Sequence, residues 1–147
     1  MAFEKRQWFA LLILILGGIG TGLLLGGDFA GLYHYGPYPG YGYACLTCVY
    51  NSSLSLTAII IGATLLALQA IFALNELIPN RFIKPNLASL IMILGIAAAG
   101  IIVAGGVSFA VEYEAYEWWF EGGFYVGLVA SIVNVVLSIL LIQATRK

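Results

Sequence analysis

Residues 86–110 read NLASLIMILGIAAAGIIVAGGVSFA, and this stretch contains no Lys, Arg, Asp or Glu. A helix needs about 20 predominantly apolar residues to cross the hydrocarbon core of a bilayer. Three further stretches of similar length are also uncharged, namely residues 8–27, 54–74 and 122–142. The sequence therefore predicts four transmembrane helices in a single domain that covers residues 1–147.

The composition leaves little material for a soluble domain beside these spans. Hydrophobic residues make up 62% of the chain and charged residues only 9%, and the mean hydropathy is +1.00. These values are typical of an all-α membrane protein embedded in a lipid bilayer. The first span follows Lys5 and Arg6, as in a signal peptide, but its apolar run continues through Leu25, which is long for a cleaved signal. We therefore expect this helix to stay in the mature protein.

The charged residues predict how the helices are oriented. All six Lys and Arg residues lie at the two ends of the chain or between the second and third spans. Because basic residues are retained on the cytoplasmic side, we expect both termini in the cytoplasm. Five of the seven acids lie in the other two connections, about residues 28–53 and 111–121. The predicted fold is an antiparallel four-helix bundle in the plasma membrane with two extracytoplasmic loops, and we do not expect nucleic acid to bind its acidic outer surface.

Small residues recur every four positions in three of the predicted spans. In lipid, close helix packing depends on small residues that let backbones approach each other. We therefore expect these stripes to be packing faces. They consist of Gly18, Gly22 and Gly26 in the first span, Gly100, Ala104 and Ser108 in the third, and Gly123, Gly127 and Ser131 in the fourth.

Gln69 and Asn134 place an amide deep inside a predicted span. Because no water is available there, we expect each amide to hydrogen-bond to another helix or to a neighbouring subunit. Ser131 and Ser138 share a helical face with Asn134. No acid, base or His lies at membrane depth to move an ion or a proton, so we expect these four residues to pack the bundle rather than to transport a solute.

The first expected outer loop alternates Tyr with Gly and Pro. Tyr buries a large area, keeps a hydroxyl for hydrogen bonding and loses little rotamer freedom, which suits a recognition surface. An aromatic belt at the level of the lipid headgroups is the alternative interpretation. The interface residues that we assign are Tyr33, Tyr35, Tyr38, Tyr41, Tyr43, Trp118 and Trp119.

Four glutamates lie close together in the second expected outer loop, at Glu112, Glu114, Glu117 and Glu121. Carboxylates at this density can bind a hard cation, but their spacing matches no established calcium loop. We therefore expect a solvated acidic face and no metal site. His34 is the only histidine, so a His-based metal site or catalytic triad would lack partners within one chain.

Cys45 and Cys48 are the only cysteines and fall in the first expected outer loop. Two intervening residues permit either a small disulfide or a redox-active dithiol. Asn51, Ser52 and Ser53 offer caps for the next helix, whose positive end could lower the pKa of a thiol. The spacing alone leaves the structural and the redox role open.

The run Cys45-Leu46-Thr47-Cys48-Val49-Tyr50, just before the second of four helices, resembles the quinone-linked disulfide oxidoreductases of the DsbB type. That resemblance implies thiol oxidation at Cys45 and Cys48 with a quinone as cofactor. The segment Gly31-Leu32-Tyr33, ahead of two cysteines, is similar to the Gly-Leu-Trp of the claudin and peripheral-myelin-protein superfamily. This second resemblance implies self-association through the outer loops and a structural disulfide.

Taken together, these features favour a membrane protein that is not an enzyme and has no cofactor. We expect its aromatic outer loops, tied by a Cys45–Cys48 disulfide, to mediate assembly with copies of itself or with another membrane protein. Two other functions stay open. One is a DsbB-like oxidoreductase that uses a quinone, and the other is an accessory subunit of a larger membrane complex.

Overall fold

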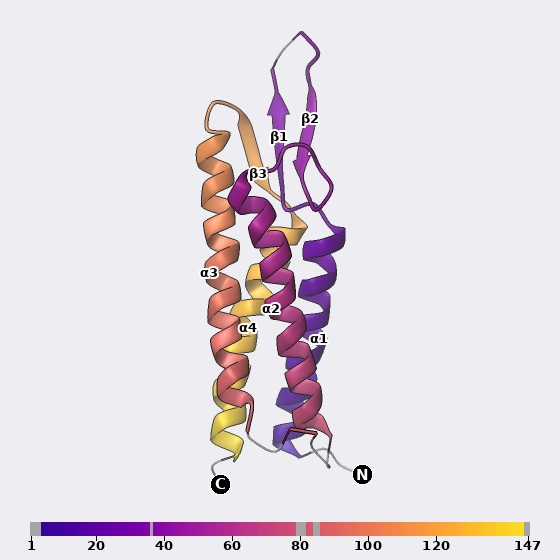
Figure 1. The fold of residues 1–147 in the computed structure, drawn as a ribbon, viewed down its shortest axis with the longest axis vertical. Helices are drawn as coiled ribbons and strands as arrows, with labels where there is room; N and C mark the ends of the chain where they lie inside the picture. The colour runs from indigo at the N-terminus through magenta and orange to yellow at the C-terminus, as the bar shows by residue number, and fades with distance from the viewer. Residues whose placement is uncertain (1–3, 36, 79–81, 84–85, 146–147) are drawn as a thin grey trace.

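Four long helices form the body of the protein, as the computed structural model in Figure 1 shows. The structure describes residues 4–35, 37–78, 82–83 and 86–145. All four helices are long and apolar enough to cross a membrane, which confirms the four predicted spans by length and composition. The helices are α1 (Lys5–Gly26), α2 (Ser53–Leu77), α3 (Ala88–Glu112) and α4 (Gly122–Thr145).

Neighbouring helices along the chain run in opposite directions, so α1 begins and α4 ends at the same end of the bundle (Figure 1). Helices α1 and α3 each pack against both α2 and α4, which places α1 and α3 on a diagonal. We call the end where α1 begins the terminal end. Four of the bases that predict the orientation lie outside the described residues, namely Arg81, Lys84, Arg146 and Lys147.

A three-stranded antiparallel sheet lies at the opposite end, which we call the sheet end. Its strands are β1 (Ala30–His34), β2 (Gly40–Ala44) and β3 (Glu117–Phe120), in the order β2-β1-β3. The prediction of an all-α fold therefore needs correction, because the protein is mostly helical but not wholly so. Strand β3 comes from the second connection and pairs with β1 from the first, so this sheet depends on contacts between distant parts of the chain.

One face of the sheet is part of the same core as the bundle. Ala30, Leu32 and Ala44 are buried and belong to a hydrophobic cluster that includes residues of α1, α2, α3 and α4. The Gly123 backbone N–H donates to the Asp28 carbonyl oxygen at 2.9 Å, which joins the start of α4 to the chain just before β1. The sheet is thereby fixed on the helices by its inner face.

The small-residue stripe of α4 packs as the sequence predicts. Gly123, Gly127 and Ser131 are all buried. A Cβ atom added at Gly127 would lie only 2.9 Å from Cγ of Leu24 in α1. Small residues here let α4 approach α1 closely.

The α1 stripe and two of the three α3 stripe residues do not face the bundle, so this part of the prediction is wrong for contacts within the chain, whereas Ser108 of α3 donates to Ser52 at the start of α2 at 3.1 Å. Helix α1 packs instead through Gly17 and Gly20, where an added Cβ would lie 2.9 Å from the Leu66 carbonyl oxygen and from the Ala130 Cβ, respectively. A spacing of four residues defines one helical face but does not determine which face meets the bundle. The exposed members of the two stripes are Gly18, Gly22, Gly26, Gly100 and Ala104.

The two buried amides connect three helices. Asn134 Nδ2 donates to Gln69 Oε1 at 3.1 Å, and Gln69 Nε2 donates to the Ile91 carbonyl oxygen at 2.8 Å. Gly95 makes room for this pair, because a Cβ atom there would lie 2.6 Å from Gln69 Nε2. The amides therefore fix α2, α3 and α4 relative to one another in a region without water.

The two serines near Asn134 bond within their own helix. Ser131 Oγ donates to the Gly127 carbonyl oxygen at 2.8 Å, and Ser138 Oγ donates to the Asn134 carbonyl oxygen at 2.6 Å. Both serines are fully buried. Each serine therefore satisfies its hydroxyl within α4 and leaves the contact with α2 to the amide of Asn134.

Candidate functional site

The outer face of the sheet carries most of the aromatic residues that the sequence assigned to an interface. Successive residues of a strand point to opposite faces, so Tyr33 points away from the buried inner face that contains Leu32. Tyr41 lies opposite Tyr33 in the register and shares its face. Tyr43 and Trp119 both lie opposite Gly31 and share this face as well.

Gly31 allows the Trp119 ring to lie across the sheet. A Cβ atom at Gly31 would lie 2.5 Å from this ring, so no other residue fits there without displacing the indole. The Trp119 Nε1 donates to the Glu121 carboxylate, which further fixes the ring. Glycine in a strand is unfavourable on its own, and here a ring from β3 fills the space it leaves.

The tyrosines of the outer face contact one another edge to face. The ring centroid of Tyr33 lies 5.2 Å from that of Tyr41 and 4.8 Å from that of Tyr35, and the Tyr41 ring lies 6.1 Å from Trp119. Each such contact contributes about 1 kcal/mol beyond the burial of area. The result is a preformed aromatic surface with little rotamer freedom left to lose on binding.

Exposure differs strongly among the predicted interface residues. Tyr38 is 90% exposed and Tyr41 is 70% exposed, whereas Tyr33 is half-buried. Trp118 lies on the other face of the sheet, opposite Leu32 in the register, with its ring 5.3 Å from Phe120. The structure thus brings Tyr33, Tyr35, Tyr41, Tyr43 and Trp119 together, places Tyr38 in the connection between β1 and β2, and separates Trp118 from them.

Two tyrosines at the sheet end have raised pKa values. The hydrogen bond to the Glu117 carboxylate raises the pKa of Tyr35, and partial desolvation adds to this shift. Burial raises the pKa of Tyr113, and repulsion from the neighbouring Glu112 carboxylate adds to it. Both phenols are therefore held in their neutral form.

The four glutamates of the second connection lie in different elements, and Glu112, Glu114 and Glu117 are exposed. Glu112 ends α3 and Glu117 begins β3, with Glu114 in the turn between them. Glu117 bonds with Tyr35 and Glu121 with Trp119. Two of the four carboxylates therefore hold aromatic residues of the sheet in place.

A disulfide joins Cys45 and Cys48 just after β2. Asn51 Nδ2 donates to the carbonyl oxygens of Cys45 and Cys48, at 2.6 Å and 2.9 Å. Ser52 then caps α2 by accepting a hydrogen bond from the Ser55 backbone N–H at 3.0 Å. Of the three predicted caps, Ser52 occupies the capping position, while Asn51 closes the cysteine loop.

Asp28 is a neighbour of the disulfide that the sequence analysis missed. A carboxylate oxygen of Asp28 and both sulfur atoms lie within 4.8 Å of one another. Metal binding needs thiolates, which a disulfide does not offer, so the oxidised group is not a metal centre. Asp28 lies far from the cysteines in sequence, and only the folding of β1 against β2 brings them together.

The sequence matches no known protein-family model and no curated protein. The resemblances to the claudin superfamily and to DsbB-type enzymes depend on two short segments, residues 31–33 and 45–50. In the structure, the first segment lies in β1 and the second includes the disulfide loop. The function must therefore be argued from the geometry of these residues.

Proposed function

We propose that this protein is a non-enzymatic membrane protein that assembles with further copies of itself through the outer face of the sheet. The observation that carries this proposal is the β1–β2 hairpin, which projects beyond the ends of the helices (Figure 1). Its most exposed side chains, Tyr38 and Tyr41, are large aromatic residues. A contiguous exposed aromatic patch is typical of a protein interaction site.

Strand β2 offers a second means of contact. It lies at one edge of the sheet, so along its outer side its backbone N–H and C=O groups have no strand partner among the described residues. Many proteins protect such an edge with Lys or Pro, and the β2 sequence Gly-Tyr-Gly-Tyr-Ala contains neither. Pairing of this edge with a strand of a second copy would extend one sheet through both molecules.

The orientation of the protein is part of the proposal. We place the sheet end outside the cytoplasm, because the bases of the chain all belong to the terminal end or to the α2–α3 link. All three lysines, Lys5, Lys84 and Lys147, would then face the cytoplasm. A membrane-impermeant amine reagent should label the protein only after the cells are permeabilised, and labelling of Lys84 in intact cells would contradict this orientation.

Energy transfer between differently labelled copies in lipid vesicles tests self-assembly. We expect transfer that increases with protein density and that falls in Tyr41→Ala. Tyr125→Ala is the matched control, because Tyr125 is 55% exposed but lies on α4 rather than on the sheet. Monomeric protein at every density, or equal loss in both variants, would contradict the proposal. Co-purification of a different polypeptide with a monomeric protein would indicate docking to a partner instead.

The position of Asp28 favours a thiol oxidoreductase as a second candidate. In that reaction a substrate thiolate would attack one sulfur of the Cys45–Cys48 disulfide and displace the other as a thiolate. A second substrate thiol would then release the oxidised substrate, and the two electrons left on the cysteines would pass to an acceptor such as a quinone. The Asp28 carboxylate could accept a thiol proton during this exchange.

Trapping of a mixed disulfide tests this second candidate. In Cys48→Ser, the remaining Cys45 thiolate can attack the disulfide of an oxidised substrate and displace one substrate thiolate, and no second cysteine is present to release the product, so an oxidoreductase should accumulate a mixed disulfide. Asp28→Asn should slow the exchange if the carboxylate takes part. A reduction potential low enough to resist the glutathione pool, together with no trapped species, would assign the disulfide a structural role.

A further inference from the structure

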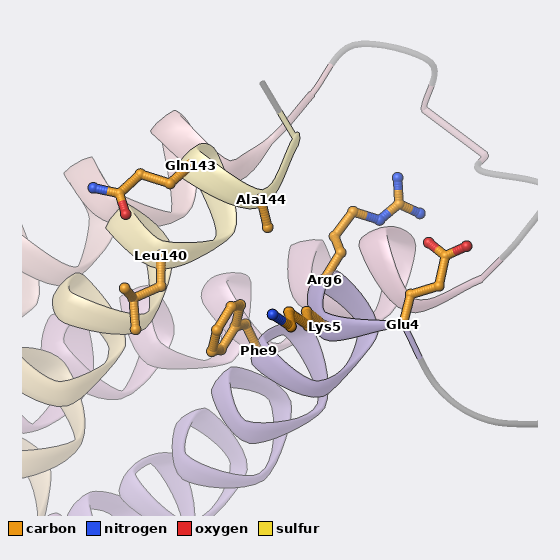
Figure 2. Close-up of a pocket in the computed structure, with 7 residues that line it drawn as sticks. All are labelled: Glu4, Lys5, Arg6, Phe9, Leu140, Gln143 and Ala144. Atoms are coloured by element: carbon orange, nitrogen blue, oxygen red, sulfur yellow. The ribbon is translucent and has the colours of Figure 1, made fainter. Parts of the chain in front are cut away.

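A pocket opens between the first turns of α1 and the last turns of α4, at the terminal end of the bundle (Figure 2). Its volume is about 390 Å³. The ends of membrane-crossing helices lie near the lipid headgroups, so the pocket occupies the boundary between hydrocarbon and water. It is lined by Glu4, Lys5, Arg6, Phe9, Leu140, Gln143 and Ala144.

Lys5 supplies an uncompensated positive charge to this pocket. Its side chain makes no hydrogen bond or ion pair with another described residue. Figure 2 shows its ammonium beside the Phe9 ring. Gln143 belongs to the α4 side of the lining, and Figure 2 shows its exposed amide directed away from Lys5. Lys5 is therefore the polar donor that we assign to the cavity.

The charges around Lys5 do not cancel it. Arg6 Nη2 donates to the Glu76 backbone carbonyl oxygen at 3.3 Å, so the guanidinium keeps its positive charge beside the pocket. The buried Glu76 carboxylate accepts from the Leu87 backbone N–H at 3.2 Å, at the start of α3. Glu4 is the one acid in the lining, and Figure 2 shows its carboxylate pointing away from α4.

We propose that this pocket binds an anionic lipid, with the lipid phosphate at Lys5 and an acyl chain against Phe9 and Leu140. Basic pockets between transmembrane helices suit such headgroups. In the sequence, two further bases, Arg146 and Lys147, directly follow Thr145. The apolar lining from Phe9 and Leu140 favours a lipid over a free phosphate ion, which would leave this surface uncovered.

Native mass spectrometry of the whole protein with added lipid tests the proposal. We expect phosphatidylglycerol to bind more tightly than phosphatidylcholine with the same acyl chains. Lys5→Gln should weaken phosphatidylglycerol binding about five-fold, because it removes one basic residue at the lipid surface, and should leave phosphatidylcholine binding unchanged. Lys5 is exposed, so this variant should keep the helix content of the wild type in circular dichroism.

Lys84→Gln is the matched control, because it removes the same charge from the sequence between α2 and α3. If Lys5 makes the specific contact, the lipid affinity of this variant should stay within about two-fold of the wild type.

Three outcomes would overturn the proposal. Equal affinity for the two lipids would show that the phosphate charge is not recognised. Equal weakening by Lys5→Gln and Lys84→Gln would show diffuse attraction to a charged surface rather than a site. Displacement of the lipid by glycerol phosphate or inorganic phosphate at the same concentration would show a site for the free anion.

Discussion

The helical bundle and the sheet differ in how much of their surface the rest of the chain covers. In the bundle, the Gln69–Asn134 pair and the Gly127 face both lie against other helices, although Asn134 Oδ1 has no hydrogen-bond partner among the described residues. The sheet buries Leu32 on one face but leaves Tyr41 and the edge of β2 open on the other. The bundle and the inner face of the sheet share one core, and the outer face and the free edge of β2 are the surface on which the proposed assembly depends.

The largest expected effect is in the bundle. Gly95→Leu would force a side chain into the space of Gln69 Nε2, Val135 and the Ser131 carbonyl. Overpacking together with the loss of a buried hydrogen bond should destabilise the protein by about 4 kcal/mol in unfolding measurements in detergent. Gly100→Leu, on the same helix with nothing within 4 Å of an added Cβ, is the control. Equal stability of the two variants would contradict the described packing.

Leu32→Ala tests the inner face of the sheet. Leu32 is 1% exposed and belongs to the shared core, so its truncation should cost about 3 kcal/mol of unfolding free energy. Because the sheet and the bundle share this core, both near-ultraviolet aromatic signals and helix content should be lost in one transition. A sheet that unfolds while the helices stay intact would show that the two regions are independent.

Removal of the disulfide should have a smaller effect. The double variant Cys45→Ser and Cys48→Ser frees a very short loop, which chain-entropy arguments value at about 2 kcal/mol. Asn51 would still hold this loop through its bonds to both carbonyl oxygens. We therefore expect energy transfer between copies to persist in this variant. Complete loss of assembly in a protein that remains folded would assign the disulfide a direct role in the contact.

The smallest effect concerns the Tyr35 phenol near the tip of the hairpin. Its pKa is raised by the hydrogen bond to Glu117, so the folded protein favours the protonated phenol. This contribution to stability is fully present below the ordinary pKa of about 10 and is lost as the pH rises through the raised value. Absorbance titration should show two late tyrosines, Tyr35 and Tyr113, and Tyr35→Phe should remove one of them. If Tyr35→Phe instead removes a tyrosine that titrates with an ordinary pKa, the hydrogen bond between Tyr35 and Glu117 is contradicted.

The helices could be predicted from the sequence because each apolar run carries its own signal, independent of partners. The sheet could not, because its glycines look like turn residues when β1 and β2 are considered alone. Gly31 is tolerated where the Trp119 ring covers it, and Gly42 where the Tyr50 ring does. These rings come from residues outside β1 and β2, so the sequences of these two strands do not predict that their glycines are covered.

The candidate site could be predicted in part for the same reason. Tyrosine content and the Cys45–Cys48 spacing are local features, and they indicated both the aromatic surface and the disulfide. Which face each aromatic residue occupies depends on strand register, and so the separation of Trp118 from the tyrosines did not follow from composition. The position of Asp28 beside the sulfurs likewise depends on the folded hairpin.

Photo-crosslinking in native membranes tests the central claim most directly. A photoreactive benzoyl-phenylalanine in place of Tyr41 would sit on the outer face of the sheet, and the same group in place of Ile93 would sit on an exposed face of α3. We predict a covalent dimer of this chain from position 41 and none from position 93. No dimer from position 41, or a dimer from position 93 alone, would contradict assembly through the sheet.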